Sequence, residues 1–279
     1  MTERLFIRLA EDVTQGPESG VPAHALRALA VPQALRRHVA HAMHYREALD
    51  EGAEVVERVL PDGALRLLIG LGERPSAVVV GASIRPAVLR LSGAMHGLSL
   101  TLRPGAALDL FGLPAIELAD QSVALAELWS DGTVELIDGL AGAPTEEACV
   151  RCIWRQLDRR AQRQNGAGPE RVSALLRQIA DTRGSLSVRE LARASGLGER
   201  RLQQLFRSHL GLSPRAFGRM ARMQSLLRAL RREHDPDWAQ LAADGGFYDQ
   251  SHLTHEFAEL IGLTPTGYRL RAISGSSKT

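Results

Sequence analysis

Three histidines stand three residues apart, at His38, His41 and His44, and this spacing first suggests a metal site. A structural zinc ion takes four imidazole, thiolate or carboxylate ligands. On a helix the third histidine turns off the face of the first pair, and on a strand His41 faces away from the other two. No carboxylate or cysteine close by completes a tetrahedral set. We therefore expect no metal ion here, and the sequence leaves a sensing role open.

Cys149 and Cys152 have the spacing of a redox pair or of half a zinc site. The stretch around them, 147–160, has apolar residues at helical spacing, and both cysteines fall on the apolar stripe. Reactive thiolates need exposure and positive neighbours, and only Arg151 and Arg155 are evident. We expect two small buried side chains, with thiol sensing as the alternative.

Residue types suited to catalysis do not assemble in this sequence. The acidic residues between 117 and 131 do not pair at a spacing suited to acid–base chemistry. No glycine-rich phosphate loop and no Ser/His/Asp order stands out. We expect no catalytic residue and no cofactor.

The composition is that of a globular protein large enough for two domains. The chain has 279 residues, of which 44% are hydrophobic and 24% charged. Residues 1–10 lack the pattern of a signal peptide, and no apolar run approaches the roughly 18 residues of a membrane span. Two cysteines fit a reducing compartment. We expect a cytoplasmic protein with no membrane contact.

The small net charge of +2 hides an uneven distribution. From Glu170 to the end there are 17 Lys and Arg against 11 Asp and Glu, whereas the preceding stretch is acidic. Between Val188 and Arg232 eleven arginines face only two glutamates. A basic block of this kind is typical of a surface that binds phosphates.

The same unit occurs twice in this basic segment, first from Leu191 to Phe217 and again from Leu241 to Tyr268. Each copy has a helical pattern, a tight turn with glycine and a second helical pattern. The offset is 50 residues up to the turn and 51 after it, so the second copy has one extra residue just past its turn. This is the pattern of a helix-turn-helix, which places its second helix in the major groove of DNA.

The second helix of each unit needs one apolar face. Leu202, Leu205 and Phe206 face the core in the first copy, as do Leu253 and Phe257 in the second. Arginine pairs well with guanine and glutamine with adenine. The residues left for solvent or DNA are Arg200, Arg201, Gln203, Gln204, Arg207, Gln250, Ser251, His252, Thr254 and His255.

A connecting helix over about 214–232 is expected between the units. Ser213-Pro214 and Thr264-Pro265 each place a cap before a proline, and Ser187 with Glu190 forms a capping box that Asp237 with Gln240 repeats. About 19 residues span about 28 Å, which suits two reading helices about one DNA turn, ~34 Å, apart. Arginines at 215, 219, 222 and 228 could touch phosphates, although solubility is the favoured role for most of them.

The chain as a whole is predicted to be α+β. The runs 65–71, 77–80, 87–91 and 98–102 indicate strands of a small antiparallel sheet or barrel, followed by helices from Ala106 onward. We place an effector-sensing or dimerisation domain at 1–163, a linker at 164–169 and an all-α DNA-binding domain at 170–279. Within the last, the units run over about 187–211 and 237–262.

The residues of the two repeated units resemble the DNA-binding domain of the AraC-type bacterial transcription regulators. The resemblance rests on the segment 246–257 (GFYDQSHLTHEF), on 262–265 (GLTP) and on Tyr268-Arg269. It implies that the residues nearest to base edges or phosphates are Arg200, Gln203, Gln204, Gln250, Ser251, Thr254 and His255.

The chain also departs from the family pattern, so its base preference does not follow from a relative. Gly198 stands where the family often has a serine cap, and Tyr248 sits at a small or polar position after the turn. Gln204 and His255 stand where arginine is frequent. More loosely, 61–63 (PDG), 103–106 (RPGA), 111–115 (FGLPA), Glu117-Leu118 and Leu128-Trp129 resemble the sensor domain of one branch of these regulators.

The sequence therefore predicts a sequence-specific transcription regulator that binds double-stranded DNA, with a small effector bound in its N-terminal domain. A homodimer and a contact with RNA polymerase are further expectations, and the helix over 147–160 is the candidate interaction surface unless it packs within its own domain. Two alternatives stay open: an effector-free DNA-binding protein, and an enzyme with an accessory helix-turn-helix. The effector, the operator and the direction of regulation are not encoded in any motif.

Overall fold

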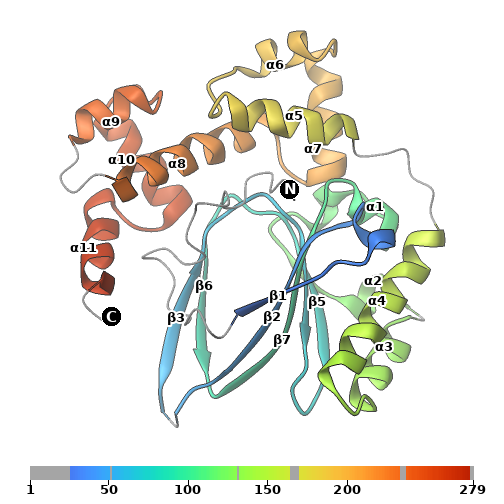
Figure 1. Cartoon of the computed structure of the whole chain (residues 1–279). Helices are drawn as coiled ribbons and strands as arrows, with labels where there is room; N and C mark the ends of the chain where they lie inside the picture. Colours follow the sequence, from blue (N-terminus) through green and yellow to red (C-terminus); the bar gives the residue numbers. More distant parts are fainter. Residues whose placement is uncertain (1–25, 51, 131, 164–169, 233–236, 277–279) are drawn as a thin grey trace.

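Figure 1 shows the computed structural model, which describes residues 26–50, 52–130, 132–163, 170–232 and 237–276. The chain forms a sheet with helices on one side, above which a set of helices carries both predicted helix-turn-helix units. The expected linker, 164–169, lies outside the described residues. No helix in the described ranges is both long and apolar enough to cross a membrane.

All strand pairs in the N-terminal part are antiparallel. The main sheet has the order β1-β2-β7-β4-β5-β8, and β3 pairs with β6 in a separate ribbon. The strands are β1 (Leu26–Leu29), β2 (Val39–Ala48), β3 (Glu54–Val59), β4 (Arg66–Gly70), β5 (Ser76–Val80), β6 (Ala87–Ser92), β7 (Ala94–Leu102) and β8 (Ser122–Ala124).

The register places rows of buried side chains on one face of the main sheet. Residues paired across neighbouring strands share a face, and every residue in two such rows is buried. The rows are Ala42, Leu100, Leu67 and Val79, and His44, Leu98, Ile69 and Ala77. One polar side chain, His44, is thus built into an otherwise apolar face.

Helices α1 to α4 cover the main sheet on one side (Figure 1). They are α1 (Ala106–Phe111), α2 (Leu125–Leu128), α3 (Gly132–Ala141) and α4 (Glu146–Arg163), with 3-10 turns η2 (Gln33–Leu35) and η3 (Ala115–Leu118). Trp129 is buried, and its indole N–H donates to the Leu110 carbonyl at 2.9 Å. The expected helix over 147–160 is α4, and it packs against α3 and α1 of its own part.

Among the described residues of the C-terminal part, all regular elements are helices. Its elements are α5 (Glu170–Asp181), α6 (Val188–Ala194), α7 (Glu199–Leu210), α8 (Pro214–Arg232), α9 (Trp238–Asp244), α10 (Gln250–Ile261) and α11 (Pro265–Ser276). The α+β class is confirmed. The four predicted strands exist. Four further strands were not predicted: polar side chains interrupt the patterns of β2 and β3, and β1 and β8 have only four and three residues.

Candidate nucleic-acid interface

The two helix-turn-helix units share one backbone geometry. The first helix of each ends at a glycine with a left-handed φ, 67° at Gly196 and 71° at Gly246. The next residue then closes the turn: Leu197 N donates to the Ala192 carbonyl, and Phe247 N donates to the Ala242 carbonyl, both at 2.9 Å. This six-to-one bond is the Schellman pattern, and glycine adopts the required φ without strain.

The extra residue of the second unit is Tyr248. Leu197 matches Phe247 at an offset of 50, whereas the N-cap Gly198 of α7 matches the N-cap Asp249 of α10 at 51. The side chain of Asp249 accepts from His252 N at 2.7 Å, whereas Gly198 offers no side-chain cap. The inserted Tyr248 is 93% exposed. It therefore presents a large aromatic side chain to solvent beside the start of α10.

The cores beneath the two reading helices are also repeated. Phe206 of α7 meets Phe217 of α8 edge to face, with ring centroids 5.6 Å apart and planes at 70°. Phe257 of α10 meets Tyr268 of α11 at the same 5.6 Å and at 73°. All four rings are buried, so each reading helix is anchored by an aromatic pair in an orientation that aromatic rings prefer.

The structure leaves the predicted reading residues at the surface. Exposed side chains on α7 are Arg200, Arg201, Gln203, Gln204 and Arg207, and on α10 they are Gln250, Ser251 and His255. Thr254 is half-buried and its hydroxyl donates to the Gln250 carbonyl at 2.8 Å. Arg201 Nη1 donates to Gln204 Oε1 at 3.1 Å, so these two side chains lie together.

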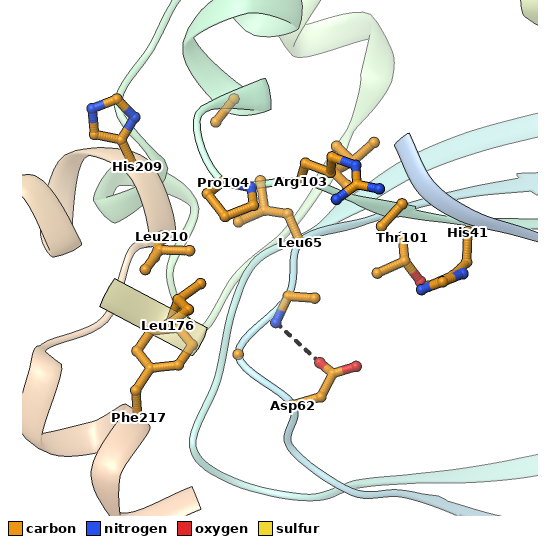
Figure 2. A pocket seen from close by; sticks show the side chains of 15 residues that line it. His41, Asp62, Leu65, Thr101, Arg103, Pro104, Leu176, His209, Leu210 and Phe217 are labelled. Atoms are coloured by element: carbon orange, nitrogen blue, oxygen red, sulfur yellow. Dashed lines mark hydrogen bonds between the residues drawn. The ribbon is translucent and has the colours of Figure 1, made fainter. Parts of the chain in front are cut away.

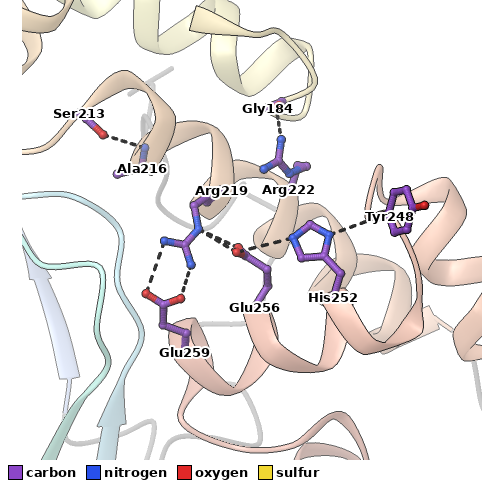
Figure 3. Close-up of polar contacts among 9 residues, drawn as sticks. All are labelled: Gly184, Ser213, Ala216, Arg219, Arg222, Tyr248, His252, Glu256 and Glu259. Atoms are coloured by element: carbon purple, nitrogen blue, oxygen red, sulfur yellow. Dashed lines mark hydrogen bonds and ion pairs between the residues drawn. The ribbon is translucent and has the colours of Figure 1, made fainter.

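His252 has a holding role in the structure. Its Nδ1 accepts from Tyr248 N at 3.1 Å, its ring packs against Phe247, and its Nε2 lies 3.8 Å from Glu256 (Figure 3). The imidazole therefore fixes the backbone of the turn around Tyr248 rather than standing free for DNA.

Two of the four arginines on the connecting helix face inward, whereas solubility was the expected role for most of them. Arg219 Nε donates to Glu256 Oε2 at 2.8 Å, and its Nη2 pairs with Glu259 of the same helix, α10 (Figure 3). Arg222 Nη1 donates to the Gly184 carbonyl at 2.9 Å, next to the first unit. The hydrogen bond from Arg219 lowers the pKa of Glu259 below its usual range. These side chains brace α8 against both units.

The capping predictions for these helices are mostly confirmed. Ser187 and Glu190 form the reciprocal capping box, with Ser187 N donating to Glu190 at 2.8 Å. Asp237 caps α9 by accepting from Ala239 N at 2.8 Å. The reciprocal half predicted for Gln240 is wrong, because its amide donates instead to Asp244 at 2.9 Å.

The C-terminal ends of both reading helices rest on the N-terminal part. Gly105 N donates to the His209 carbonyl of α7 at 3.0 Å, and Arg58 Nη1 donates to the Ile261 carbonyl of α10 at 3.3 Å. Gly211, which follows α7, is so close to η3 that a Cβ on it would lie 2.8 Å from the Ala115 carbonyl oxygen. Of the exposed reading residues of α7, Arg200, Arg201, Gln203 and Gln204 lie in its N-terminal half, whereas Arg207 is in its last turn.

A cavity of about 40 Å³ lies at this junction (Figure 2). Asp62, Leu65 and Thr101 line it from the sheet side, and His209 and Phe217 line it from the helical side. A water molecule needs roughly 10–15 Å³ of such volume, so there is room for a few waters at most and not for a larger effector.

The histidines and cysteines of the N-terminal part are dispersed among separate contacts. His38 is buried and pairs with Asp109 at 3.1 Å, whereas His41 lines the junction cavity. The expectation of no metal site concerned carboxylates and cysteines close by in the sequence. His44 instead meets His96 and Glu146, which come from distant segments. Cys149 and Cys152 are buried as expected, and burial raises the pKa of the Cys149 thiol.

Comparison with known proteins bears on both parts of the chain. Residues 191–271 match a family described as a helix-turn-helix domain. The C-terminal segment is an AraC-type helix-turn-helix domain. Residues 28–124 match a family described as a domain of unknown function (DUF6597). None of the curated proteins compared with the chain matches it.

Solved structures of ToxT from Vibrio cholerae are similar to the chain at low identity. An apo variant of ToxT is 12% identical, with 83% of this chain and 97% of that one covered and a TM-score of 0.38. Another crystal form is 9% identical, with 82% and 97% covered and a TM-score of 0.37. A ToxT structure with a bound unsaturated fatty acid is 12% identical, with 77% and 85% covered and a TM-score of 0.34.

Proposed function

We propose that this protein is a sequence-specific transcription regulator whose AraC-type domain reads two successive major-groove segments of double-stranded DNA. The observation that carries this proposal is the repeated unit: two reading helices with the same turn, the same aromatic anchor and an exposed polar face. A repeated scaffold with different side chains on each copy suits the recognition of two different base sequences.

The geometry of the connecting helix supports binding by both units at once. Helix α8 has 19 residues and therefore a length of about 28 Å. Successive major-groove segments on one face of a duplex are about 34 Å apart, and the side chains of the reading helices can cover the difference. The ion pairs of Arg219 with Glu256 and Glu259 hold α8 and α10 in a fixed relation.

We assign base reading to the N-terminal halves of α7 and α10. Arg200 and Gln203 can each donate to base edges, and Gln250 and Ser251 open α10 in the same way. Arg201, Gln204, Arg207, Thr254 and His255 are assigned to bases or phosphates next to them. Half or more of such contacts go to phosphate and sugar, which fix the position of the protein on the duplex.

We assign control to the N-terminal part, since it touches the C-terminal ends of both reading helices. A small effector that favours one arrangement of this part would shift the population of DNA-binding conformations. The contacts at His209 and Ile261 give such a shift a direct path to both helices.

The test is selection of bound sequences from a random duplex pool by the full chain, at about 50 and about 200 mM salt. We expect an enriched motif with two elements about one helical turn apart and a steep loss of affinity with salt. Salt-sensitive binding without enrichment would favour an effector-free architectural protein instead. Absence of binding at both salt concentrations would contradict the proposal.

A matched pair of arginine variants separates reading from general charge. Arg200→Ala should weaken binding to the selected motif by about 5–150-fold, the loss of one paired base contact. Arg74→Ala removes the same charge from the exposed turn between β4 and β5, at the end of the sheet away from the helical part, and should leave affinity unchanged. Equal losses in the two variants would contradict base reading by Arg200.

A further inference from the structure

A cluster of two histidines and one glutamate lies on the helix-covered face of the main sheet, far from the DNA-binding helices in sequence. His44 is on β2, His96 is on β7, and Glu146 is the first residue of α4. His44 pairs with Leu98 across the strands, and His96 precedes Leu98 by two residues, so both imidazoles project from the same face. Three separate elements thus bring one side chain each to a common point.

The three ligand atoms are spaced as the corners of a coordination polyhedron. The Nε2 atoms of His44 and His96 are 3.0 Å apart, and Glu146 Oε2 lies 3.3 Å from the first and 3.9 Å from the second. Ligands about 2.0–2.1 Å from a tetrahedral zinc ion are separated by about 3.3–3.4 Å. The two imidazole nitrogens are within hydrogen-bond distance of each other, and the carboxylate oxygen of Glu146 lies within 3.9 Å of both.

The surroundings of the cluster orient the carboxylate of Glu146 and leave one side of the cluster open to solvent. Arg27 forms an ion pair with Glu146 Oε1, the oxygen that does not face the histidines. A partner of this kind fixes a ligating carboxylate from outside. His44 is 5% exposed, but His96 and Glu146 are 28% and 21% exposed, so water can reach the cluster from their side.

We infer that His44, His96 and Glu146 form a binding site for a divalent transition-metal ion, with Zn²⁺ the best fit and a fourth position open to water. Two imidazoles and one carboxylate are a known zinc ligand set, and sites with three protein ligands keep one position free. The site is independent of the proposed DNA binding, because none of its residues belongs to the helical part.

The test uses the full chain without a histidine tag, stripped of metal by a chelator. Zn²⁺ is titrated against a chromogenic chelator, and Co²⁺ is added separately to observe the visible bands of tetrahedral coordination. We expect one ion per chain at this site. Because even outer-shell partners are worth about 10–100-fold in affinity, His96→Ala and Glu146→Gln should each weaken Zn²⁺ binding by about 100-fold or more.

A control variant on the same strand, β2, tests whether the loss of Zn²⁺ binding is specific to the cluster. His41 lies on the opposite face of β2, and His41→Ala should leave the Zn²⁺ affinity and the Co²⁺ spectrum unchanged. Thermal unfolding separates loss of ligand from loss of fold: Zn²⁺ should raise the Tm of the wild-type chain but not that of folded His96→Ala or Glu146→Gln. Absence of Zn²⁺ binding by the wild type, or equal binding by wild type and both variants, would overturn the assignment.

Discussion

At the scale of single residues, arginines of the C-terminal part differ in role: some are exposed and others hold helices together. Arg200 on α7 is exposed, whereas Arg219 on α8 is 16% exposed and is held by two glutamates. Both lie at helical positions that the sequence pattern leaves available for solvent. Their difference comes from neighbours: the partners of Arg219 follow it by 37 and 40 residues and belong to another helix. Local periodicity cannot reveal such a contact, so the pairing of Arg219 could not be predicted from the sequence.

Tyr248 offers a prediction at this scale. An aromatic side chain that is 93% exposed contributes little to folding, and it stands beside the first residues of α10. We expect Tyr248→Ala to leave the Tm within error and to weaken DNA binding by about tenfold, the loss of roughly one hydrogen bond to a charged phosphate. Fluorescence anisotropy with the selected duplex measures the affinity.

The variant Tyr248→Phe is the matched control for the hydroxyl. If the phenol donates to a phosphate, Phe should weaken binding as much as Ala does. A Phe variant with wild-type affinity would instead indicate that the ring stacks or packs on the duplex. Unchanged affinity in both variants would exclude a contact by Tyr248.

At the scale of elements, α8 acts as a brace and its ion pairs can be tested as such. Arg219→Ala leaves Glu256, whose side chain is 12% exposed, without its cationic partner. Because removal of one partner strands a partly buried charge, we expect the free energy of unfolding to fall by about 2–3 kcal/mol. Urea denaturation followed by circular dichroism measures the change.

A double variant serves as its control. Arg219→Met with Glu256→Gln removes the charge from both partners and should recover much of the loss, because the less exposed carboxylate is then neutral, whereas Glu259 is 35% exposed and keeps its charge close to water. If the double variant lost as much free energy of unfolding as its two single variants together, the interaction between Arg219 and Glu256 would contribute nothing to stability.

Substitution of two glycines with similar φ distinguishes the cost of backbone strain from the cost of losing contact with the N-terminal part. Gly196 has φ 67° and nothing within 4 Å of its would-be Cβ, whereas Gly211 has φ 82° and meets the Ala115 carbonyl oxygen at 2.8 Å. We expect Gly196→Ala to cost about 1–2 kcal/mol from strain alone. Gly211→Ala should cost more, because α7 must also move away from η3; equal losses in urea denaturation would contradict that contact.

The elements of the two parts differ in how far the sequence predicts them. Repeated caps, glycine turns and apolar spacing predict α6 to α11 closely, because each signal is local. In the sheet, β2 carries His41, His44, Arg46 and Glu47, so its alternation is hidden, and its role depends on pairing with β7 more than fifty residues later. His96 and Glu146 were missed for the same reason: register and helix docking, not spacing, bring them to His44.

At the scale of the whole molecule, the junction between sheet and helices joins the proposed sensing and reading functions. Its contacts include the backbone of His209 at the end of α7. The His209 side chain is half-buried there, and its buried Nδ1 atom has no hydrogen-bond partner among the described residues. His38 and Asp109 lie buried on the sheet side of the same region. Titratable groups that are buried where two parts meet make the stability of that junction depend on pH.

The sign of that dependence follows from the histidines. Burial lowers the pKa of His209 and of His38 below the ordinary value of about 6.5. The unfolded chain therefore takes up protons first, so the stability that the neutral rings contribute is present above about pH 6.5 and is lost as pH falls below it. We expect the free energy of unfolding to fall by up to about 1.4 kcal/mol per histidine and pH unit just below that value.

Urea denaturation between about pH 5.5 and 7.5 measures this change in the free energy of unfolding. His209→Gln, which cannot titrate, should have a shallower slope than the wild type, whereas an unchanged slope would mean that the His209 ring is already protonated or solvated in the folded chain.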